Sequence, residues 1–166
     1  MKNSGAVVRK FKAKYPNLLV AKRVLKNDII GILELCTEVI FGAEFFGYKK
    51  LPAFKIIIND DAAWRGMANC FPVKELSSNS YGHKLRFRMD YVAIKKYLFC
   101  PGKFAAVHST YLHELCHVFG GDSSPNFSGA LSDIIEAQLL SVKQILLFSE
   151  RWDEIDSRGD SSPDDS

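Results

Sequence analysis

The spacing of hydrophobic residues divides the chain into segments with helical and strand-like periods. Between Ile29 and Ala43 apolar residues recur every three or four positions, which predicts a core helix. Asn27 or Asp28 can cap the start of this helix, and Gly47 can end it.

Two shorter segments have the composition of strands. Residues 54–58 form a β-branched run between Pro52 and the turn signal at residues 59–61. Residues 85–94 alternate apolar and charged side chains, so this strand should have one solvated face. The polar residues 77–82 predict a turn, and we expect the two strands to pair antiparallel.

Two helices are predicted in the second half of the chain. Residues 103–119 have a helical period and end at Gly120 and Gly121, which suit a left-handed turn. After the polar loop 122–128, residues 129–152 are apolar on most of a helical circumference, and we expect this helix to be largely buried. The sequence thus predicts an α+β fold in which a small antiparallel sheet packs against helices.

Composition bounds the number of domains and the class of partner. With 166 residues, 47% of them hydrophobic, the chain can bury one core. We expect one domain over residues 1–155 and a disordered tail at 156–166, which has no apolar residue. The formal charge of +3 is mild, and the basic cluster at residues 9–26 is typical of a solvated helix face, so no nucleic-acid partner is expected.

Cysteine usage and hydropathy favour a cytoplasmic protein. The four cysteines contain no C-x-x-C pair, which gives neither a metal knuckle nor a dense disulfide framework. Residues 1–14 lack the apolar core of a secretory signal, and glutamates at positions 34, 38 and 44 interrupt the most apolar stretch. We therefore expect neither export nor membrane insertion.

The segment His113-Glu114-Leu115-Cys116-His117 carries the chemistry. Two histidines four residues apart on a helix project from one face and can bind a single Zn²⁺. Glu114 is rotated away from the first coordination shell, yet it can reach a water molecule at the open position and act as its general base. The plain alternative is that these are packed or surface residues, but an apolar helix would still have to provide buried polar partners for them.

A third zinc ligand has to come from elsewhere in the chain. No histidine follows His117, which leaves a carboxylate. Glu136 is the first choice because an antiparallel second helix would carry it over the metal, between the motif helix and the following helix. Asp122 is the alternative, since it follows the Gly120 turn closely. Asp133, one turn before Glu136, would orient one of the two histidines through its free ring nitrogen.

The motif resembles the zinc-binding helix of the zincin metallopeptidases, and with Glu136 downstream it is similar to their gluzincin branch. The resemblance covers residues 107–140. Gly120 also matches the metzincin pattern, but Ser123 stands where the third histidine of that branch would be. The resemblance implies a zinc metallopeptidase that hydrolyses peptide bonds with zinc-activated water, with His113, His117 and Glu136 as metal ligands and Glu114 as catalytic base. It also implies that the strand over residues 85–94 would be the substrate-side edge.

Two further points stay open at this stage. Tyr111, Tyr81 or His83 could stabilise the oxyanion that peptide hydrolysis develops. A different kind of function is also possible, in which a zincin-like module binds zinc for interaction or sensing and does not turn over. The intact Glu114 argues against this alternative, because a purely structural site has no use for a base.

Overall fold

The computed structural model describes residues 28–57 and 65–160, which form an α+β fold. The strands are β1 (Ala53–Ile57), β2 (Gly66–Ser78) and β3 (Lys84–Lys95), in the order β1-β3-β2. β2 and β3 form an antiparallel hairpin around the predicted turn, whereas β1 pairs with β3 in parallel. The prediction of antiparallel pairing between the strands near residues 54–58 and 85–94 was therefore wrong. The intervening strand β2 reverses the chain, so β1 and β3 run in the same direction.

The strand β2 was not predicted from the sequence, and Pro72 lies within it. Proline cannot donate a ladder hydrogen bond, and a strand is tolerant of it only at an edge or a bulge. β2 is an outer strand, and Pro72 lies opposite Phe87 of β3 immediately before an irregular stretch at residues 73–76. A proline argues against a central strand, but it is compatible with an edge strand such as β2.

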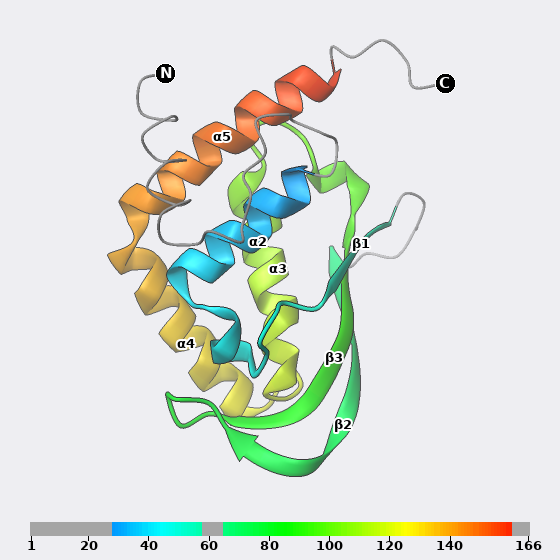
Figure 1. Cartoon of the computed structure of the whole chain (residues 1–166), viewed down its shortest axis with the longest axis vertical. Coiled ribbons are helices and arrows are strands. Elements are labelled where there is room, and N and C mark those ends of the chain that lie inside the picture. Colours follow the sequence, from blue (N-terminus) through cyan, green and yellow to red (C-terminus); the bar gives the residue numbers. More distant parts are fainter. Residues whose placement is uncertain (1–27, 58–64, 161–166) are drawn as a thin grey trace.

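A bulge in β3 changes which side chains face the core. Asn69 lies opposite Tyr91 and Cys70 lies opposite Met89, which leaves Asp90 as an extra residue in β3. Before the bulge, alternate residues such as Arg88 are exposed, and after it Val92 and Ile94 are fully buried. Bulges bend and twist a strand locally, and the β2–β3 ribbon is strongly curved (Figure 1).

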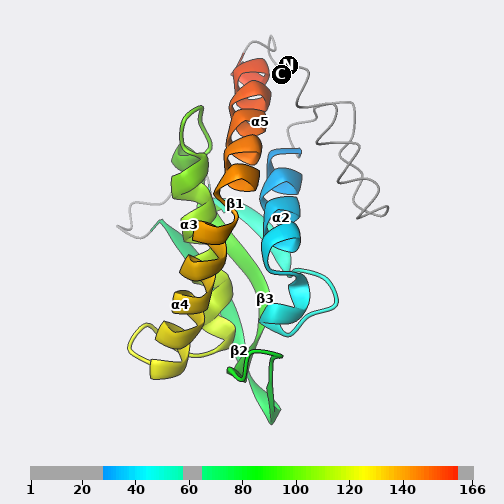
Figure 2. The same cartoon turned by 90° about the vertical axis from the view of Figure 1, so that its left-hand side faces the viewer.

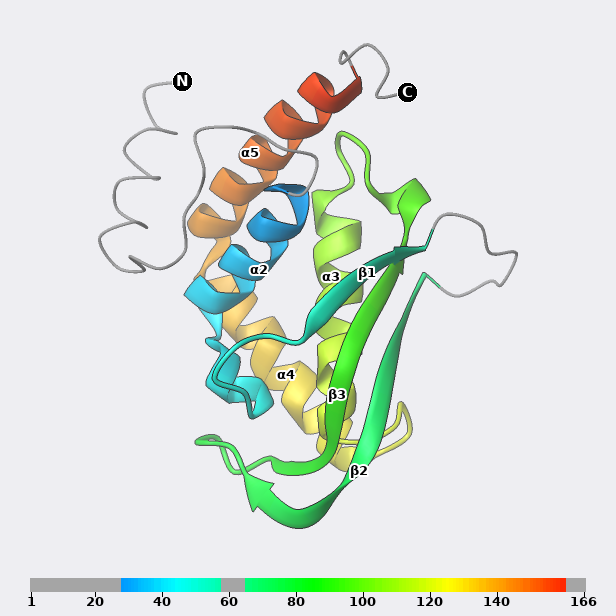
Figure 3. The same cartoon turned by 45° about the vertical axis from the view of Figure 1, so that its right-hand side comes forward.

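The helices lie on one side of this sheet (Figure 3). They are α2 (Asp28–Ile40), α3 (Phe104–Leu115), α4 (Pro125–Leu140) and α5 (Val142–Asp160), with short 3₁₀ turns η1 (Ala43–Phe46), η2 (Lys96–Leu98) and η3 (Cys116–Val118). The helix α5 continues past residue 155, the predicted end of the domain. None of the described helices is long and apolar enough to cross a bilayer.

The core fills the space between the sheet and the helices. Its largest fully buried side chains include Trp152, Tyr111, Phe46, Phe104 and Phe119. The Trp152 ring contacts Phe104, and its Nε1–H donates to the carbonyl oxygen of Cys100 at 3.1 Å. These contacts fix α5 against the start of α3.

A single helix over residues 129–152 is replaced by two helices that meet at Ser141. The helix α4 packs against η3, and the break allows α5 to turn back and pack against α2 (Figure 1). One straight helix could not reach both of these partners. The expectation that this region is largely buried was also wrong for its outer face, where Leu139 and Leu140 are exposed.

Candidate metal centre

The two motif histidines lie at the end of α3, where the helix tightens. His113 belongs to the last turn of α3, and His117 belongs to the 3₁₀ turn η3 that follows. Their ring centroids are 5.2 Å apart and their planes are nearly perpendicular. The i and i+4 spacing thus brings the two imidazoles together as predicted.

The Gly120 turn returns the chain so that Asp122 faces both histidines. Its Oδ1 atom lies 3.1 Å from Nε2 of His113 and 3.6 Å from Nε2 of His117. The Oε2 atom of Glu114 lies 3.6 Å from the same His117 nitrogen. Among the described residues, one group of three His, Cys, Asp or Glu side chains has ligand atoms all within 4.8 Å of one another, and it consists of His113, Glu114 and His117.

These separations fit a tetrahedral ion. Zinc binds nitrogen and oxygen at about 2.0–2.1 Å, so two of its ligand atoms stand about 3.3 Å apart. The distances from Asp122 to the two imidazole nitrogens lie on either side of this value. The residues present therefore fit a zinc ion held by two imidazoles and one carboxylate.

His117 is oriented by the loop that follows it. Its Nδ1 atom lies 3.1 Å from the carbonyl oxygen of Gly120, so Nδ1 carries the proton and donates it to this carbonyl. The Nε2 lone pair is then free for a metal ion, the arrangement that outer hydrogen bonds give to metal-binding histidines. Gly120 has a φ of 151°, which favours glycine.

A phenylalanine from α4 packs against both imidazoles. The Phe127 ring is stacked on His117 at 4.9 Å and meets His113 edge-on at 5.1 Å. Phe127 itself is buried. The first turn of α4 therefore supplies an aromatic support for the two rings, which motif spacing alone does not predict.

Glu136 is not brought into this cluster. It is exposed on α4, and among the described residues the carboxylates that pair with the two histidines belong to Asp122 and Glu114. Asp122, the alternative third ligand, is the carboxylate that lies beside both histidines. Its side chain is 74% exposed, which means that it reaches the site from the solvent side.

Glu114 lies in a buried environment beside strand β2. Burial raises the pKa of its carboxyl above the usual range for glutamate; His117 and His113 oppose this rise, and Asp122 adds to it. A Cβ atom added at Gly66 would lie 3.2 Å from Cγ of Glu114 and 2.8 Å from Cγ2 of Thr110. The missing side chain at Gly66 thus leaves room for the stem of Glu114.

The cluster opens into a cavity of about 870 Å³ between α3 and the edge strand β2. Four of its lining residues come from the sheet: Met67, Ala68, Cys70 and Phe87. The polar cluster contributes four others: His113, Glu114, His117 and Asp122. β3 was expected to be the free edge, but it is the central strand, paired on both sides, so this expectation was wrong. The edge at the cavity is β2.

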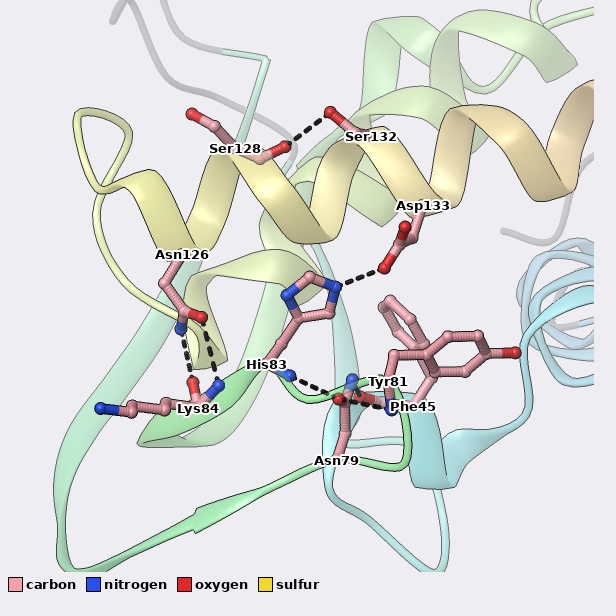
Figure 4. A network of polar contacts seen from close by, with 9 residues as sticks. All are labelled: Phe45, Asn79, Tyr81, His83, Lys84, Asn126, Ser128, Ser132 and Asp133. Atoms are coloured by element: carbon pink, nitrogen blue, oxygen red, sulfur yellow. Dashed lines mark hydrogen bonds and ion pairs between the residues drawn. The ribbon is translucent and has the colours of Figure 1, made fainter.

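Asp133 does not orient either motif histidine. It contacts Nε2 of His83, at the start of the hairpin strand β3 (Figure 4). Nearby, the Nδ2 atom of Asn126 donates to the carbonyl oxygens of Lys84 and Phe119, at 2.6 and 2.7 Å. These contacts join the start of α4 to the hairpin and to the end of the motif segment.

The remaining candidates lie away from the cavity. Tyr111 is fully buried, Tyr81 is an exposed side chain of the hairpin turn, and His83 pairs with Asp133; none of them lines the cavity. His108 is a core residue stacked on Phe104. All four cysteines are free, and Cys116 is buried.

Comparisons with known proteins found no matching family model, no similar curated protein and no similar solved structure. The resemblance to zincins therefore rests on the sequence motif alone.

Proposed function

We propose that the chain is a zinc-dependent metallopeptidase. The observation that carries this proposal is the convergence of two imidazole Nε2 atoms and the Asp122 Oδ1 atom, beside a buried glutamate, at the floor of an open cavity. His113, His117 and Asp122 are the proposed ligands. Asp122 takes the place that the sequence pattern gave to Glu136, because its Oδ1 atom lies beside both imidazole Nε2 atoms, whereas Glu136 pairs with neither histidine within the described residues.

Zinc would supply a Lewis acid that polarises the peptide carbonyl and lowers the pKa of a water molecule. The protein's own part is to position the reactants and to move the proton. Glu114 accepts a proton from the attacking water and then passes it to the leaving amine.

The cavity supports a peptide as the substrate class. The edge strand β2 borders the catalytic cluster, and an edge strand presents unpaired backbone groups that an extended peptide can meet. The apolar side chains Met67, Ala68 and Phe87 in the lining favour an apolar residue near the cleaved bond.

A non-catalytic zinc module is less well supported. A structural zinc site is closed by four protein ligands, whereas this cluster faces a cavity and holds a carboxyl that would have no structural task.

The decisive experiment compares Glu114→Gln with His113→Ala/His117→Ala. The purified wild type should contain about one zinc per chain by elemental analysis, and the double variant should contain none. Glu114→Gln should keep the metal while cleavage of a peptide library falls by about two orders of magnitude or more, the scale of a lost general base. Zinc in the double variant would refute the metal site. Loss of zinc in Glu114→Gln would refute the role of base.

A further inference from the structure

Five large hydrophobic side chains stand exposed on either side of the break between α4 and α5. Ile135, Leu139 and Leu140 come from α4 and are 55%, 70% and 81% exposed; Val142 and Leu146 come from α5 and are 47% and 57% exposed. We call these five residues the elbow patch. Ile135 and Leu139 on α4 are four residues apart, as are Val142 and Leu146 on α5, so each pair lies on one face of its helix. Exposed apolar side chains grouped in this way mark an interaction site.

The elbow patch is not part of a displaced core. The inner faces of both helices already supply buried residues, Phe127 and Ile134 from α4 and Phe148 and Trp152 from α5. The helix α4 packs on η3, and α5 packs on α2 and α3. Figure 2 looks onto the side formed by α4 and α5, which run in front of the sheet. The patch therefore lies on faces that the described core leaves free.

Two charged residues beside the elbow patch indicate which kind of partner would bind there. Glu136 on α4 and Lys143 on α5 are both exposed, and neither forms an ion pair with the part of the chain that the structure describes. They carry opposite charges and stand on opposite sides of the break at Ser141. Such a surface is complementary to itself when two copies are related by a two-fold axis and α4 of each copy lies against α5 of the other.

We propose that the elbow patch is the interface of a symmetric homodimer. In an isologous contact, residue i meets residue j and residue j meets residue i. A two-fold axis at the break sets Leu139 against Val142 of the second copy, with Leu140 at the centre and Ile135 and Leu146 one turn outward. The same axis brings Glu136 close to Lys143 of the second copy, twice. The opposite alignment, α4 on α4, would set Glu136 against Glu136.

The dimer has the organisation of a specific interface, with an apolar centre and a charged rim. The proposal is independent of the metal centre, since the proposed ligands His113, His117 and Asp122 lie on other segments of the chain. It also assigns Glu136 to an ion pair across the interface and not to the metal centre.

Sedimentation of the full chain tests this proposal. At about 100 µM, far above a micromolar Kd, the mass should be near twice the 18.7 kDa of one chain. Leu139→Ser/Leu140→Ser should give a monomer that still unfolds cooperatively, because both side chains are exposed on the single chain. Its unfolding transition should match that of the wild type diluted until the dimer dissociates. Leu76→Ser, at a similarly exposed position on β2, should leave the dimer intact.

A charge exchange tests the two-fold arrangement. Glu136→Lys should weaken dimerisation by roughly tenfold or more, since like charges then meet, and adding Lys143→Glu should restore it. A monomeric wild type at this concentration would overturn the proposal and leave the patch to residues 1–27 or to another protein. A dimer that survives the serine substitutions, or a double exchange that restores nothing, would overturn it as well.

Discussion

The carbonyl oxygen of Gly120 accepts a hydrogen bond from Nδ1 of His117 at 3.1 Å, and this contact connects the loop to the metal centre. An added Cβ at Gly120 would lie 2.6 Å from Oγ of Ser124, at a φ of 151° that side chains rarely adopt. Gly120→Ala should therefore shift the loop and release His117. We expect zinc affinity to fall by about 10–100-fold, the usual effect of losing such a support.

Gly121 offers the matched control for this prediction. An added Cβ there meets no atom within 4 Å, so Gly121→Ala should bind zinc like the wild type in a competition titration with a chelator. Equal affinity of both variants would show that the loop does not hold His117.

Asp122→Asn and Glu136→Gln separate the two candidates for the third ligand. Asp122→Asn should weaken zinc binding by at least about tenfold, because an amide oxygen carries no charge for the metal. Glu136→Gln should have no effect, since this side chain lies outside the cluster. Competition titrations of both variants measure this directly, and the reverse result would restore the gluzincin-like assignment.

The pairing of His113 and His117 could be predicted from the sequence because it depends only on helical geometry. Two histidines at i and i+4 meet on one face of a helix whatever surrounds them, and His113 and His117 do so. The third ligand depends on a loop. Glu136 was preferred on the assumption that its helix face is buried, where a carboxylate would need a cation. The face is exposed, so that requirement disappears.

The parts of the fold that failed to follow from the pattern are set by tertiary contacts. Ser141 interrupts an apolar helical period because α5 packs on α2, and no local signal in residues 129–152 records this partner. The edge strand β2, which contains Pro72, was not predicted either. The parallel pairing of β1 with β3 depends on this strand, so both errors in the sheet have one origin.

Gly66 should affect catalysis without affecting the metal. The substitution Gly66→Ala places a Cβ against Thr110 and the stem of Glu114, and one of these side chains has to move. Because the three atoms nearest to this Cβ belong to Thr110, Ala93 and Glu114 and not to the two histidines, zinc affinity should stay within about threefold of the wild type. The kcat for peptide cleavage should fall by roughly 10–100-fold, since a small misplacement of a catalytic group is costly. A matched loss of metal would show that Gly66 supports the whole site and not Glu114 alone.

Gly31→Ala is the control for this substitution. Gly31 lies in α2, and an added Cβ there meets nothing within 4 Å. The variant should keep both kcat and zinc affinity. A fall in kcat in this variant too would mean that the effect of Gly66→Ala reports general destabilisation.

His108 should make the stability of the fold depend on pH. It is buried between elements, stacked on Phe104 at 5.3 Å, and its Nε2 lies 3.3 Å from Oγ1 of Thr37. The Thr37 hydroxyl donates its proton to the carbonyl oxygen of Leu33, so it accepts from His108, which is satisfied as a neutral ring. Burial lowers the pKa of His108 to about 4.

The direction of the effect follows from this pKa. The pKa of histidine in an unfolded chain is near 6.5. Between pH 6.5 and about 4 the unfolded chain therefore binds a proton at this residue that the folded chain does not bind, so the stability of the fold decreases as the pH falls. At pH 5 this residue should cost roughly 2 kcal/mol relative to pH 7. The carboxyls of the partly buried Glu34 and Glu38 and of the buried Glu114 have raised pKa values and act in the opposite direction, so the total change does not report His108 by itself.

The comparison with His108→Gln isolates its contribution. Glutamine keeps a side-chain donor for Thr37 and does not titrate, so the variant should be less stable at pH 7 yet lose less stability on acidification. Urea unfolding followed by tryptophan fluorescence at pH 7 and pH 5 measures both effects. A chelator is needed throughout, because metal binding by histidines is itself pH-dependent. Parallel loss of stability in the two proteins would mean that His108 is already protonated, or exposed to solvent, in the folded state.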